Sequence, residues 1–88
     1  MANHKSAEKR IRQNIKRRAR NRSIRTRVGT QTKSLRGAII AGNAETTEQQ
    51  LRLTMRELNK AASKGVLKKK TASRRIARLA KAVHAAQI

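Results

Sequence analysis

Apolar residues recur at helical spacing along this chain of 88 residues, and the pattern predicts helices and no strands. In the middle of the chain the apolar positions step by four, three and four residues, which places them on one stripe: Leu51, Met55, Leu58 and Ala62. Towards the C-terminus a second set falls within an arc of roughly 120°: Ala72, Ile76, Leu79, Ala80, Val83 and Ala86. Both stripes are typical of helices that pack one face into a core.

The predicted fold is all-α, with three helices and no strands. We expect the first helix over about Lys5 to Ala41 and the second over about Ala44 to Lys64. The third is expected to end near Ala86 and to begin at Lys68 or Thr71. The chain has no proline, and Gly42 and Gly65 each follow a helical pattern, which suits a left-handed residue that ends a helix.

Local signals refine the limits of these helices. Thr46 to Gln49 fits a capping box for the second helix, and Asn43 is an alternative cap one turn earlier. Gly29 and Gly37 fall inside the first helix, where each weakens it by roughly 1 kcal/mol relative to alanine. We therefore expect a bend or local fraying at these two glycines.

The apolar residues of the first helix divide it into two parts. Ile24, Val28, Leu35 and Ile39 form one stripe, whereas Ile11 and Ile15 lie roughly 120° or more away from it. A straight helix cannot bury both sets in the same core. The sequence thus predicts a single domain in which residues 24–88 form a three-helix bundle and residues 1–23 project from it as a basic helical arm.

The balance of charge points to a polyanionic partner. The chain has 24 Lys and Arg against 4 Asp and Glu, a formal net charge of +20. Eleven of the basic residues lie between Lys5 and Arg27, and residues 66–88 add seven with no acidic residue. A segment with such a charge cannot be buried in a protein core, and the phosphate backbone of a nucleic acid is the simplest partner for it.

Basic residues occupy nearly every side of the predicted arm, which favours folded RNA over duplex DNA as the partner. A helix charged all round suits insertion among several phosphate strands, and arginine offers them planar, bidentate contacts. Polar side chains between the charges can reach sugar hydroxyls or base edges: Asn3, Gln13, Asn14, Asn21 and Ser23. Like charges four residues apart destabilise an isolated helix, so we expect residues 1–20 to be largely unfolded without an anion.

The sequence offers no basis for catalysis or for a metal site. Cysteine and aromatic residues are absent, His4 and His84 lie near opposite ends, and no carboxylate has a matching partner. We expect no enzyme, no cofactor, no small-molecule substrate and no homo-oligomer. No stretch is long and apolar enough to cross a bilayer.

Three alternatives use the same basic composition. A membrane-surface helix needs a continuous apolar face, which Ile11 and Ile15 alone do not supply. A transit peptide is also rich in arginine, but here the basic character returns at Lys68 to Arg78. A free nucleoid or regulatory nucleic-acid-binding protein is the third and main alternative.

Several motifs resemble the bacterial small-subunit ribosomal protein family numbered twenty. The opening MAN-x-KSA-x-KR is followed by a KRR-x-x-N step that ends at Asn21. An A-G-N turn at residues 41–43 and an AA-x-KG-V turn at residues 61–66 extend the resemblance over the whole chain. Where that family often has an asparagine cap before its third helix, this chain has Lys70, which leaves the start of that helix open.

The resemblance implies a long basic helix followed by two more, and direct binding to 16S ribosomal RNA during assembly of the small (30S) subunit in the cytoplasm. Together with the charge pattern it predicts RNA-binding residues in two groups. The group on the arm is Lys5, Lys9, Arg10, Arg12, Lys16, Arg17, Arg18, Arg20, Asn21, Arg22, Arg25 and Arg27. The group at the third helix is Lys68, Lys69, Lys70, Arg74, Arg75 and Arg78.

Overall fold

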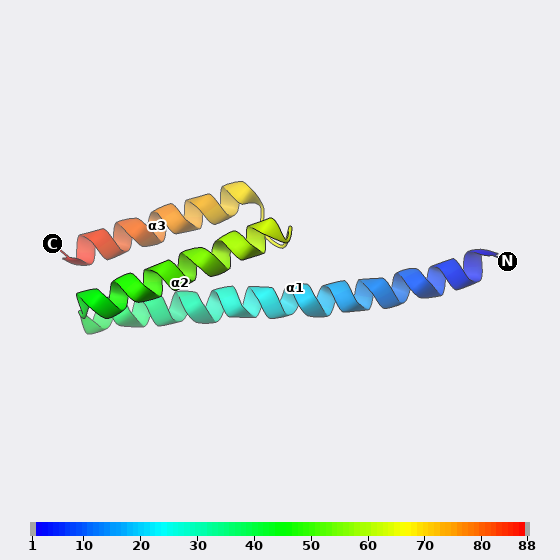
Figure 1. The fold of residues 1–88 in the computed structure, drawn as a ribbon, viewed down its shortest axis with the longest axis horizontal. Helices are drawn as coiled ribbons and strands as arrows, with labels where there is room; N and C mark the ends of the chain where they lie inside the picture. Colours follow the sequence, from blue (N-terminus) through cyan, green and yellow to red (C-terminus); the bar gives the residue numbers. More distant parts are fainter. Residues whose placement is uncertain (1, 88) are drawn as a thin grey trace.

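A computed structural model of the protein describes residues 2–87, with side chains for residues 5–86. It contains three helices, α1 (Ala2–Ala41), α2 (Ala44–Ser63) and α3 (Lys69–Gln87) (Figure 1). No strand occurs within the described range, so the predicted all-α class is confirmed. None of these helices has a window apolar enough to span a membrane.

Helix α1 runs without interruption through both of its internal glycines (Figure 1). The bend or fraying expected at Gly29 and Gly37 is therefore wrong. Their neighbours Val28 and Leu35 are buried against the rest of the bundle. This packing offsets the low helix propensity of glycine, because tertiary contacts contribute more to helix stability than propensity does.

The turn between α1 and α2 is fixed by Gly42 and Asn43. Gly42 has φ of +79°, a left-handed conformation that favours glycine, and its N–H donates to the carbonyl of Ala38 at 3.1 Å. The Asn43 side-chain oxygen accepts from the Thr46 N–H at 3.1 Å. Asn43 is thus the cap of α2, and the capping box predicted to start at Thr46 is wrong.

The second turn, between α2 and α3, has the hydrogen bonds of a Schellman motif. Gly65 has φ of +75° and donates to the Ala62 carbonyl at 3.1 Å, while Val66 donates to the Ala61 carbonyl at 2.9 Å. Val66 is buried, so the same residue that closes the turn also anchors it to the core. The predicted role of Gly42 and Gly65 as helix-ending turns is confirmed.

Helix α3 starts close to the earlier of its two expected positions. It begins at Lys69, and the Lys68 carbonyl accepts from the Ala72 N–H at 3.0 Å. The alternative start at Thr71 is wrong, because Thr71 lies inside the first turn.

Helix α2 is the central element of the bundle. It packs along α1 on one side and along α3 on the other, whereas α1 and α3 make little direct contact (Figure 1). The buried apolar side chains come from all three helices and from the second turn: Val28, Leu35, Leu58, Ala61, Val66, Ala72, Leu79 and Val83. Of the residues expected in the α3 stripe, only Ala86 is exposed.

Two buried threonines of α2, not predicted from the sequence, bond carbonyl groups of α1. Thr54 is fully buried, with its hydroxyl 2.7 Å from the Gln50 carbonyl and 3.4 Å from the Gln31 carbonyl on α1. The Thr47 hydroxyl lies 2.7 Å from the Asn43 carbonyl and 3.1 Å from that of Ala38. Bonding to a carbonyl four residues earlier satisfies a threonine hydroxyl inside a helix and permits its burial.

The molecule is elongated because α1 extends well past the other two helices. Its radius of gyration is 17.7 Å and its extents are 66 × 21 × 13 Å. A compact domain of this length has a radius of gyration of about 12 Å. The excess length is the N-terminal half of α1, which extends beyond the turn between α2 and α3 (Figure 1).

Two leucines on α2 provide a matched test of this core. Leu58 is fully buried, whereas Leu53 is 45% exposed. We expect Leu58→Ala to lower the free energy of unfolding by about 2–5 kcal/mol, because it removes a packed side chain and leaves a cavity. Leu53→Ala should change it by less than about 1 kcal/mol. Urea unfolding followed by circular dichroism measures both, and equal losses would contradict the packing described.

Candidate nucleic-acid interface

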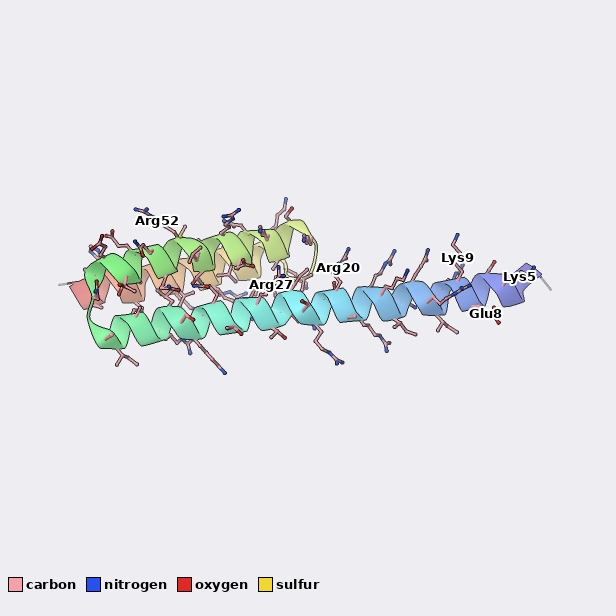
Figure 2. All side chains as sticks on the ribbon, turned by 60° about the horizontal axis from the view of Figure 1, so that its bottom comes forward. Lys5, Glu8, Lys9, Arg20, Arg27 and Arg52 are labelled. Atoms are coloured by element: carbon pink, nitrogen blue, oxygen red, sulfur yellow. The ribbon has the colours of Figure 1, made fainter. Side chains whose placement is uncertain are left out.

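The N-terminal half of α1 has no contact with the core. Every described side chain from Lys5 to Arg20 is exposed, and burial along the helix begins only at Asn21 and Ile24. Ile11 is 58% exposed and Ile15 is 61% exposed, so the prediction that they lie away from the core stripe is confirmed. Figure 2 shows the side chains of this half directed outward on several sides, from Lys5 and Lys9 to Arg20.

The eleven basic residues of α1 from Lys5 to Arg27 fall into three groups by direction around the helix, taken at about 100° per residue. One group lies on one side of the core stripe, centred roughly 110° from it: Lys5, Lys9, Arg12, Lys16, Arg20 and Arg27. A second group, Arg10 and Arg17, lies within roughly 20° of the direction of Val28 and continues the core stripe past the end of the bundle. The third group is Arg18, Arg22 and Arg25. All eleven are exposed, and together they surround the helix.

The second basic segment lies at the end of the bundle past which α1 continues alone. Lys68, Lys69 and Lys70 are exposed at the start of α3, directly after the turn that closes α2. This turn lies beside the middle of α1 (Figure 1), and Figure 2 places Arg20 and Arg27 of α1 in the same region. The fold therefore brings the basic residues at the start of α3 close to the middle of α1, where the basic segment of that helix ends.

Four arginines from α1 and α3 line a common groove. Arg25 and Arg36 come from α1, and Arg75 and Arg78 come from α3, with the buried Val28, Ala61 and Leu79 also lining it. The groove has a volume of about 600 Å³ and no carboxylate among its lining residues. The remaining predicted residue of α3, Arg74, is exposed but does not line this groove.

Arg36 is the basic residue of this groove that the sequence prediction missed. It was not assigned to RNA because it lies outside the densely charged arm. Its spacing of eleven residues from Arg25 is close to three helical turns, so the two side chains extend in nearly the same direction. That spacing is a signal in the sequence, but it becomes informative only when the opposing Arg75 and Arg78 are known.

Asn21 occupies the point where the arm leaves the bundle. Its side-chain oxygen is buried and has no hydrogen-bond partner. Arg18, Arg22 and Arg25 line the same shallow hollow as Asn21. A buried acceptor without a partner costs about 1–3 kcal/mol, and a turn of the amide towards the hollow would bring it within reach of a donor such as a ribose hydroxyl.

Within the described side chains, no group of three or more His, Cys, Asp or Glu is placed to hold a metal ion. His84 is exposed on α3, and the side chains of Asn3 and His4 lie outside the described residues.

The unpartnered oxygen of Asn21 leads to a prediction about the free protein. Asn21→Ala should leave the free energy of unfolding unchanged or raise it by up to about 1 kcal/mol, because it removes an unsatisfied acceptor and introduces a better helix former. Thr54→Ala is the control and should lower it by about 1–2 kcal/mol, because the Thr54 hydroxyl is bonded and fully buried. Thermal melts give both values. A clear loss of stability in Asn21→Ala would show that this amide has a structural partner.

Comparison with known proteins places the chain in a family. A sequence profile of the family described as Ribosomal protein S20 matches residues 2–84. The small ribosomal subunit protein bS20 of Helicobacter acinonychis is 51% identical over 79 residues, which cover 90% of this chain and 89% of that protein. The proteins of the same name from Campylobacter curvus and Wolinella succinogenes are 51% and 49% identical, over 96% and 90% of this chain and 94% and 87% of their own lengths. This chain, with its long basic helix and two shorter ones, therefore belongs to the Ribosomal protein S20 family.

Proposed function

We propose that the protein is a structural, non-enzymatic constituent of the small ribosomal subunit in the cytoplasm, and that it binds 16S ribosomal RNA directly. Its relatives are named as proteins of the small ribosomal subunit. The observation that carries the RNA-binding part is the exposed run from Lys5 to Arg20, which contains eight basic residues and one acidic residue, a net charge of +7. A helix so charged, with no core contact, is stabilised by surrounding phosphates.

In this proposal the protein is a single domain with two parts that have different tasks. Residues 24–88 form the bundle that holds α1 in place, and residues 1–23 form the arm that enters the RNA. Contacts to phosphate come from the basic residues of the arm and from six residues at α3: Lys68, Lys69, Lys70, Arg74, Arg75 and Arg78. Asn21 contributes its unpartnered oxygen at the junction.

The distribution of charge supports folded RNA over a DNA duplex. A recognition helix for DNA presents a few base-reading side chains on one face above a firm core. Here the basic residues surround the arm, which suits contact with several phosphate strands at once. Comparable affinity for 16S ribosomal RNA and for duplex DNA would favour the alternative, a free nucleoid or regulatory protein.

Replacing Arg17, Arg18 and Arg20 with alanine tests the role of the arm. Binding to 16S ribosomal RNA, measured by filter binding over a range of salt, should weaken by at least tenfold near physiological salt. The slope of log affinity against log salt should become shallower by about 2–3, because each phosphate contact contributes about 0.7–0.9 to it. The melting temperature of the free protein should stay nearly unchanged, since these side chains are exposed.

The matched control removes the same number of charges from α2. Arg52, Arg56 and Lys60 are exposed there, and Figure 2 shows Arg52 on the bundle, far from the arm. Replacing these three with alanine should leave the salt slope close to that of the wild type. Equal losses in both triple variants would mean that total charge, rather than the arm, determines binding.

A further inference from the structure

We propose that the groove between α1 and α3 receives one unpaired nucleotide of the bound RNA, with the base on the apolar floor and the phosphates on the arginines of the rim. This inference rests on the proposed function and makes it more specific. It assigns a role to Arg36, which lies outside the basic arm, and it predicts that the protein contacts a base as well as the RNA backbone.

The floor of the groove is apolar and firmly packed. Val28, Ala61 and Leu79 are core residues at most 9% exposed, and the half-buried Leu67 is the apolar lining side chain with surface left for a ligand. A phosphate gains nothing from such a floor, because it needs donors or water, whereas the face of a base is stabilised by apolar contact.

Gly29 leaves one wall of the groove without a side chain. It lines the groove, and a Cβ atom placed on it would meet no atom within 4 Å. The resulting volume of about 600 Å³ is within the range of small-ligand pockets. An alanine would be compatible with the helix at this position, so the fold itself does not require glycine here.

The rim determines what kind of ligand fits. Its charged residues are Arg25 and Arg36 on α1 and Arg75 and Arg78 on α3, with no carboxylate to neutralise them. The two arginines of α1 are about 16 Å apart along the helix axis, so guanidinium groups are present towards both ends of the groove. This charge favours an anionic ligand. Because the chain has no aromatic residue, arginine planes are its remaining surface for stacking on a base.

The groove continues into the arm along one side of α1. Arg25, Gly29 and Arg36 line the groove, and Arg22 and Arg18 follow within roughly 60° of the same direction beyond the end of the bundle. A strand that leaves the groove therefore meets arginines without crossing to another face of the helix. The proposed nucleotide site is thus continuous with the interface on the arm.

The test compares Gly29→Leu with Gly37→Leu. Both residues lie inside α1, and a Cβ placed on either would meet no atom within 4 Å, but Gly37 lies on the side opposite Val28 and outside the groove. Both variants should melt at or above the wild-type temperature, because leucine is a better helix former than glycine. We expect Gly29→Leu to bind 16S ribosomal RNA at least tenfold more weakly than the wild type, and Gly37→Leu to bind within about twofold of it.

Chemical probing of the Watson–Crick edges of the RNA bases provides the second readout. At saturating protein, an unpaired base protected by the wild type and by Gly37→Leu should become reactive with Gly29→Leu. Unchanged affinity in Gly29→Leu, equal losses in both variants, or weaker binding with no base regaining reactivity would each overturn the inference. Those results leave RNA binding by the wild type intact, whereas failure of the wild type to bind 16S ribosomal RNA would refute the proposed function as well.

Discussion

Repulsion between like charges along α1 is the constraint on which the rest of the structure depends. The arm places basic residues four apart in sequence, as at Lys5 and Lys9 or at Lys16 and Arg20. Each such pair destabilises an isolated helix by a few tenths of a kcal/mol. No burial offsets this cost before Asn21 and Ile24. The arm is therefore a helix whose stability must come from outside the chain, and phosphate groups are the partners that its surface fits.

The bundle holds the C-terminal half of that helix in place. With α2 in the middle, the C-terminal half of α1 is fixed by Val28 and Leu35 and by the threonine contacts of Thr47 and Thr54. The two glycine turns fold the chain back so that α3 returns its own basic residues to the middle of α1. The small core is thus sufficient to orient one long helix and the basic residues at the start of α3.

Much of this arrangement could be predicted from helical periodicity. The directions of Ile11 and Ile15 relative to Val28 were enough to predict that they are exposed, since direction along a regular helix follows from residue number alone. The limits of the second helix were also close, because Gly42 and Gly65 are typical helix-ending residues.

The errors arose where tertiary packing decides between local alternatives. Asn43 and Thr46 both fit the start of α2, and the position of the turn after α1 selects Asn43. Thr54 has a polar side chain, which the sequence gives no reason to bury. It is fully buried because its hydroxyl bonds a carbonyl of its own helix. Arg36 joins the groove only because α3 returns alongside α1, and nothing in the local sequence around Arg36 indicates this.

The central claim is that RNA phosphates stabilise the helix of the arm while the bundle is stable without them. Hydrogen–deuterium exchange of the backbone amides, with and without 16S ribosomal RNA, tests it most directly. The account predicts that amides between Lys5 and Arg20 exchange rapidly in the free protein and slowly in the complex. Those around Leu58 and Ala61 should be protected in both. Equal protection of the arm in the free protein and in the complex would contradict it.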